Sequence, residues 1–87
     1  MNKNNNNLNP TIMKRNEIKQ MLINAHFAGA KFCQENMNRL IGQDKEFMQM
    51  LNGLNLPEFS RIEQRIMREW YVGYDTILAE KMTNSIN

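Results

Sequence analysis

The stretch from Pro57 to Met82, PEFSRIEQRIMREWYVGYDTILAEKM, decides the fold. Its large apolar residues recur at spacings of three and four, which is the periodicity of one face of an α-helix. The stretch therefore predicts a helix over about 57–82. We expect its core-facing stripe to consist of Phe59, Ile62, Ile66, Trp70, Tyr74 and Ile77.

The start of this helix can be read in two ways. Ser60 followed by Glu63 forms a possible capping box, in which each residue satisfies a backbone N–H of the other. Asn55 followed by Glu58 forms a second one. Both interpretations stay open at this point.

Two further helices precede this stretch. Residues 11–41 contain no proline, and their apolar residues also recur at helical spacing, so we expect a long helix that ends at Gly42. Asp44 can cap a short helix over about 44–52. No strand or hairpin pattern is present. The sequence therefore predicts an all-α fold, an antiparallel helical hairpin of two long helices with a short helix between them.

Length and composition describe one small domain. The chain has 87 residues, 41% apolar and 23% charged, which are the proportions of a folded protein. Its single cysteine cannot form an internal disulfide, and residues 1–10 lack the apolar core of a secretory signal. We therefore expect a cytoplasmic protein without membrane contact. It divides into a disordered polar arm over 1–9, one helical domain over 10–82 and a frayed tail over 83–87.

The residues needed for catalysis or metal binding are sparse. His26 and Cys33, the only histidine and cysteine, lie two helical turns apart, about 10 Å along the axis and beyond hydrogen-bonding distance. One of each is too few for a structural zinc site, and the four glycines do not form a phosphate-binding loop. We expect His26 to be partly buried and hydrogen-bonded. The sequence thus predicts no catalytic residue, no cofactor and no metal, and a chain that is not an enzyme.

Positive charge is distributed unevenly. Residues 1–42 carry a net charge of +4 and residues 43–87 carry −2. At 100° per residue, one group of arginines lies opposite the core stripe of the third helix, namely Arg61, Arg65 and Arg68. A second basic group opens the first helix, namely Lys14, Arg15 and Lys19. These groups either dock on phosphates or form solvated faces whose charges pair with neighbouring acids, among them Glu58, Glu69 and Asp75.

Both long helices carry more apolar surface than one packed pair can bury. The surplus on the first helix includes Ile12, Ile23, Ala30, Met37 and Ile41, and that on the third includes Met67, Tyr71, Leu78 and Met82. The short helix together with Leu54 and Leu56 can cover part of it, and otherwise a second copy or a partner does. Small residues in the first helix are expected to pack against Trp70 of the same chain, namely Ala25, Ala28, Gly29 and Ala30.

The sequence favours a small helical interaction protein. Its composition, rich in asparagine, methionine, isoleucine and lysine, suggests a low-GC genome, and the run Asn4–Asn7 resembles an unselected polar tail. Short chains of this kind are frequent on phages and other mobile elements. We expect it to bind and inhibit a host protein or ribonucleoprotein complex, as an anti-CRISPR-type inhibitor does. The residues expected at the interface are Arg61, Arg65, Arg68 and Tyr71, with Lys14, Arg15 and Lys19 as a second patch.

Two alternatives remain. Residues 48–62 resemble a helix-turn-helix motif, in which the arginines of the third helix would face a DNA groove and the chain would act as a dimeric regulator. A long turn containing Pro57 counts against this interpretation, as does Gln49, which stands where such motifs usually have alanine. The other alternative is a purely structural oligomer, with a homodimer held together through the surplus apolar surface.

Overall fold

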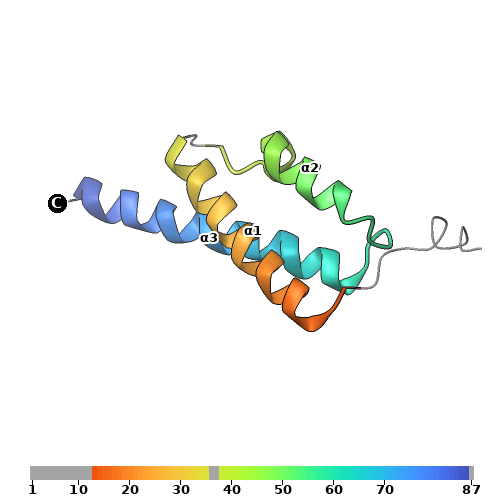
Figure 1. Cartoon of the computed structure of the whole chain (residues 1–87). Helices are drawn as coiled ribbons and strands as arrows, with labels where there is room; N and C mark the ends of the chain where they lie inside the picture. Colours follow the sequence, from red (N-terminus) through yellow and green to blue (C-terminus); the bar gives the residue numbers. More distant parts are fainter. Residues whose placement is uncertain (1–12, 36–37, 87) are drawn as a thin grey trace, which may run out of the picture.

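The computed structural model describes residues 13–35 and 38–86 (Figure 1). Over these residues all regular structure is helical, in the order α1 (Arg15–Glu35), the 3-10 helix η2 (Ile41–Gln43), α2 (Lys45–Gly53) and α3 (Arg61–Ile86). The predicted all-α fold, with two long helices packed on each other and a short helix between them in sequence, is confirmed. The polar arm predicted over 1–9 lies outside the described residues.

The first helix is shorter than predicted. α1 ends at Glu35 rather than at Ile41, and η2 follows after an extended residue, Leu40. Ile41 is buried, and Arg39 binds Asp75 of α3. A helix continued to Ile41 would move away from α3, because the two long helices cross at an angle (Figure 1). The break in the helix is therefore what returns both side chains to α3.

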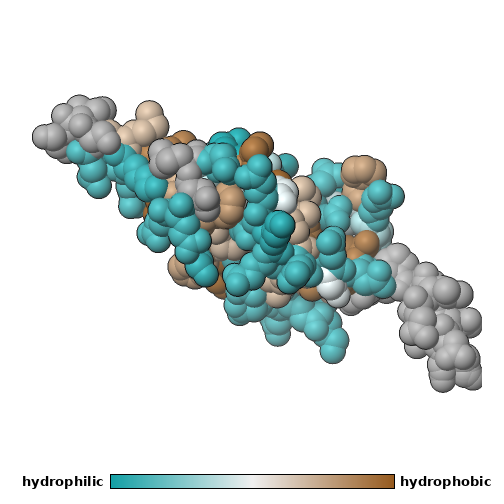
Figure 2. All heavy atoms as spheres, turned by 90° about the horizontal axis from the view of Figure 1, so that it is seen from above, coloured by the Kyte–Doolittle hydropathy of each residue, from teal (hydrophilic) through white to brown (hydrophobic). Residues whose placement is uncertain are grey.

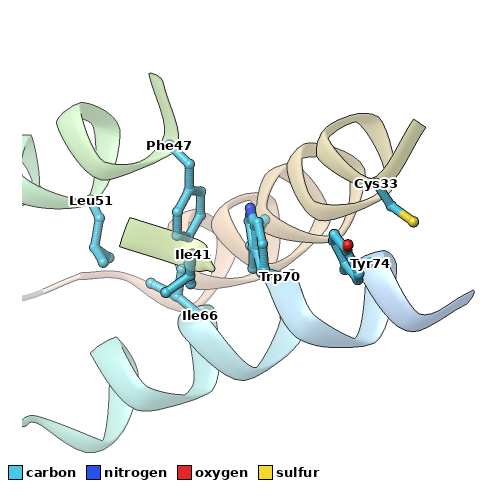
Figure 3. Packing of buried hydrophobic residues seen from close by; sticks show 8 residues of the cluster. Cys33, Ile41, Phe47, Leu51, Ile66, Trp70 and Tyr74 are labelled. Atoms are coloured by element: carbon cyan, nitrogen blue, oxygen red, sulfur yellow. The ribbon is translucent and has the colours of Figure 1, made fainter. Parts of the chain in front are cut away.

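Asp44 caps α2, as predicted. Its Oδ1 accepts a hydrogen bond from the Phe47 N–H at 3.1 Å, which satisfies one of the donors that a helix start leaves unpaired. Phe47 and Leu51, one turn apart, are the buried residues of α2. Figure 3 shows both side chains directed from α2 toward α3. This short helix therefore covers one side of the core.

The Ser60 half of the predicted capping box begins α3, whereas the Glu63 carboxylate accepts the N–H of Phe59 rather than that of Ser60. The Ser60 Oγ accepts a hydrogen bond from the Glu63 N–H at 3.1 Å. Asn55, the cap of the alternative start, has a positive φ of 53° and stays outside the helix. α3 also continues past its predicted end at Met82, so the segment expected to fray is helical as far as Ile86.

The two long helices run in the same direction, and the antiparallel arrangement predicted from the sequence is wrong. His26 of α1 bonds Glu69 of α3, and farther along both helices the Lys81 Nζ donates to the Cys33 carbonyl. In Figure 1 both helices run from right to left, and α2 runs back above them. Each successive helix thus reverses direction, which makes the first and third parallel.

Two glycines set the close approach of α1 and α3. A Cβ atom on Gly29 would lie 1.8 Å from the carbonyl oxygen of Trp70, and one on Gly73 would lie 1.9 Å from that of His26. Both obstacles are backbone atoms, so no side-chain movement can relieve them. The predicted packing of the small residues of α1 against Trp70 is therefore confirmed for Gly29, which meets the backbone of Trp70.

Trp70 forms the centre of the core (Figure 3). It is fully buried, and four aromatic rings lie with their centroids 5.1 to 6.4 Å from its own: Phe32, Phe47, Tyr71 and Tyr74. The other buried members of the cluster are Ala25, Cys33, Ile41, Leu51 and Ile66. The core thus joins α1, α2 and α3 around a single indole ring.

Part of the surplus apolar surface remains exposed. Leu54 and Leu56 are half-buried against the core, as expected. On α1, however, Ile23 is 45% exposed and Phe27 is 68% exposed. Figure 2 shows apolar atoms between hydrophilic side chains on the face seen from above. Within the described residues, the short helix therefore covers only part of the surplus apolar surface of the long helices.

Candidate functional site

Arg61, Arg65 and Arg68 form an exposed row on α3, here called the arginine stripe. Their spacing of four and three residues places them on one side of the helix. Ile66 and Trp70, on the opposite side, are fully buried. The structure therefore brings the three arginines together on the outward face of α3, as the sequence predicted.

The acids expected to neutralise this stripe bind elsewhere. Glu69 Oε2 lies 3.0 Å from His26 Nδ1, and both side chains are about one-third exposed. Asp75 accepts two hydrogen bonds of 2.7 Å from Arg39. Among the described residues, no ion pair or hydrogen bond joins the side chains of the arginine stripe to another group. The interpretation of the stripe as an ion-paired surface is therefore wrong for Glu69 and Asp75.

Tyr71, the aromatic residue expected at the interface, is half-buried. Its half-buried ring packs edge-to-face on Trp70 at 5.1 Å, and the Arg39 Cζ lies 4.6 Å from its centroid. Tyr71 thus lies between the core and a cation of its own chain.

The Arg39–Asp75 pair was missed by the sequence analysis. Arg39 donates through Nε and one terminal nitrogen to the two oxygens of Asp75, a bidentate geometry. This hydrogen bonding lowers the pKa of Asp75, and the attraction of the guanidinium adds to the effect. Arg39 lies in the irregular segment after α1, where no helical spacing relates it to α3. Only the tertiary structure places the two side chains together.

The second basic patch lies at the start of α1. Lys14, Arg15 and Lys19 are all exposed. Glu17 accepts a hydrogen bond from the backbone N–H of Lys14 at 2.8 Å and so caps the chain there. Lys19 precedes His26 by two turns and Arg65 precedes Glu69 by one turn, so each lies on the same side of its helix as a member of the His26–Glu69 pair. One member of each basic group, Lys19 and Arg65, therefore lies on the side of the helix pair that carries this contact.

Phe59 was expected in the core, but it is 76% exposed. α3 begins only after Ser60, so Phe59 does not follow the helical periodicity of Ile62 and Ile66. Its φ of 59° is left-handed, a strained conformation for a residue with a Cβ. The Phe59 N–H donates to Glu63 Oε1 at 3.2 Å, and the Gln64 Nε2 donates to the Phe59 carbonyl at 2.9 Å. These bonds hold an exposed aromatic residue just before the N-terminus of α3, where the arginine stripe begins.

Metal ligands, nucleophiles and membrane-spanning helices were also sought in the described part of the chain. No group of three or more His, Cys, Asp and Glu side chains there could hold a metal ion. His26 is half-buried and bonded to Glu69, whereas Cys33 is buried in the core. No helix in this part is long and apolar enough to cross a membrane.

Comparisons with known proteins add no relative. Neither the protein-family models, nor the curated proteins, nor the solved structures contain a match to this chain.

Proposed function

We propose that this chain is a non-catalytic binding protein whose arginine stripe docks on an acidic protein surface. In its concrete form it is a cytoplasmic inhibitor, encoded by a phage or mobile element, that blocks a host protein or ribonucleoprotein complex as anti-CRISPR proteins do. The observation that carries the proposal is that three exposed guanidinium groups share one face while Glu69 and Asp75 are bound elsewhere.

Arginine suits this role because its planar fork of donors matches a carboxylate and is less strongly hydrated than an ammonium group. Phe59 adds an apolar contact at one end of the stripe. Interfaces are enriched in arginine and aromatic residues at their energetic centres. A strained backbone that persists at an exposed phenylalanine supports a binding role for its ring.

An acidic protein surface fits these residues better than a nucleic acid does. Glu58 precedes Phe59, and the Glu63 carboxylate accepts a hydrogen bond from its N–H, so the partner must place an uncharged, apolar site at the ring. A protein surface can offer such a site beside its acids, whereas a continuous phosphate backbone cannot. The helix-turn-helix alternative also meets an obstacle. Seven residues, 54–60, separate α2 from α3, whereas the turn of that motif has about three or four.

Retrieval of the tagged chain from a lysate of its source organism, with and without nuclease, tests the proposal. Proteins and nucleic acids that co-purify are identified by mass spectrometry and gel analysis. We expect a stoichiometric protein partner that remains bound after nuclease treatment. Recovery of nucleic acid alone, lost on nuclease treatment, would contradict the proposal and favour the DNA-binding alternative.

A further inference from the structure

A groove of about 520 Å³ lies between α1 and α2. Its apolar lining comes from Phe27, Ala28 and Phe32 of α1 and from Phe47 and Met50 of α2. These residues recur at helical spacing on each element, so both helices direct an apolar face toward the groove. The volume is within the range that proteins use for binding compact apolar groups.

Phe27 lines this groove and is also largely exposed to solvent. The side chain lines the groove, yet 68% of the residue is exposed. Ile23, one turn earlier on α1, is 45% exposed. Among the described residues, Phe27 makes an edge-to-face aromatic contact with His26, with the ring centroids 6.2 Å apart. The chain thus presents an apolar groove and an apolar projection side by side.

We propose that a second copy of this chain occupies the groove. The two copies are related by a two-fold axis, and each places its Phe27 in the groove of the other. In such an interface the same surface patch must complement itself. A groove with a projecting phenylalanine on its edge meets that condition, since every projection has a matching cavity on the other copy.

The charges around the groove support this occupant. Its lining carries both signs, with Lys31 and Lys45 as cations and Glu35 and Glu46 as acids. Lys31 and Glu46 are 3.9 Å apart with side chains 62% and 87% exposed, so neither is buried in that pair. A two-fold axis can set the cations of one copy against the acids of the other. The arginine stripe carries only positive charge and could not pair with itself in this way.

The proposed dimer is independent of the arginine stripe. The stripe lies on α3 opposite its buried face, whereas the groove is formed by α1 and α2. Dimerisation would therefore leave two stripes exposed and double the number of docking surfaces. A failure of this inference leaves the proposed function untouched, because the two are measured separately.

Sedimentation velocity on the full chain, from low to high micromolar concentration, tests the inference. We expect a reversible dimer for the natural sequence and a monomer for Phe27→Asp. Phe59→Asp is the matched control, because Phe59 is equally large and more exposed but lies outside the groove. This control should remain dimeric, and circular dichroism should show the same helix content for all three proteins.

A second variant, Lys31→Glu, tests the same interface if Phe27→Asp does not fold. It makes the edge of the groove predominantly acidic and should weaken the dimer about tenfold or more through repulsion between copies. A natural chain that stays monomeric throughout would overturn the inference. So would a dimer that both groove variants leave intact, because it would then use another surface.

Discussion

The carboxylate of Asp44 joins the start of α2 to the buried Trp70 of α3. One oxygen accepts the Phe47 N–H at 3.1 Å, and the other accepts the indole N–H at 2.8 Å. Trp70 is fully buried, so its N–H has no access to water and needs this acceptor. A single side chain thus caps one helix and satisfies the central residue of the core.

Replacement of Asp44 should therefore cost more than loss of an ordinary cap. Asp44→Ala removes the cap and leaves the Trp70 N–H unpaired, which should lower the free energy of unfolding by about 2–3 kcal/mol. Ser60→Ala, which removes only the cap of α3, should cost about 1 kcal/mol. Urea denaturation followed by fluorescence of the single tryptophan measures both. Equal losses would show that the bond to Trp70 contributes nothing.

The glycine at the helix crossing should not tolerate a methyl group. Gly29→Ala places a Cβ atom 1.8 Å from a backbone oxygen, so the helices must separate, at a cost of about 3 kcal/mol. Gly53→Ala is the matched control, because nothing lies within 4 Å of its Cβ position. The control should change stability by less than about 0.5 kcal/mol. Similar melting temperatures for the two variants would contradict the close approach.

The starts of α2 and α3 could be predicted from the sequence, because the residues that cap a helix lie close together in the chain. The caps at Asp44 and Ser60 are formed by residues three positions apart, and both are used in the structure. The relative direction of the long helices had no such signal, because it depends on how the connections around α2 reverse the chain. Phe59 shows an intermediate case, since its spacing from Ile62 fits a helix but its place before the Ser60 cap puts it outside.

Relief of the strained backbone at Phe59 should change stability and partner binding in opposite directions. Phe59→Gly should raise the free energy of unfolding by about 0.5 kcal/mol, because relief of the left-handed strain exceeds the added flexibility of the unfolded chain. The same change should weaken partner binding, because the exposed ring is lost. Phe59→Ala separates the two effects, since it removes the ring and keeps a Cβ. A destabilised glycine variant with unchanged binding would refute the assignment.

Acid should weaken the Arg39–Asp75 pair. The pair lowers the folded-state pKa of Asp75 below its ordinary value of 3.8, so its stabilisation is complete above that value and disappears as the pH falls through the lower one. Both side chains are about half exposed, which limits the contribution to about 0.5–1 kcal/mol. Asp75→Asn should therefore reduce the melting temperature at neutral pH, and the difference should close as the pH falls through the lowered pKa of Asp75. A difference independent of pH would exclude the ion pair as its cause.

The candidate site was predicted only in part, because helical spacing is a local signal and tertiary contacts are not. Helical spacing placed Arg61, Arg65 and Arg68 together, and all three are exposed. The partners of the neighbouring acids could not be predicted, because His26 reaches Glu69 only across the helix crossing. That tertiary contact is what leaves the stripe without the acid expected to neutralise it.

Binding by a charge-reversed stripe tests the central claim most directly. The double variant Arg65→Glu and Arg68→Glu is compared with the natural chain for retention of its protein partner, by quantitative mass spectrometry and then by titration of that partner. Gln49→Glu, which adds an acid at an exposed position of α2 outside both the arginine stripe and the groove, is the control. We predict that the double variant loses affinity about 30-fold or more while its helix content and melting temperature stay unchanged. Undiminished binding by a folded double variant would contradict the account.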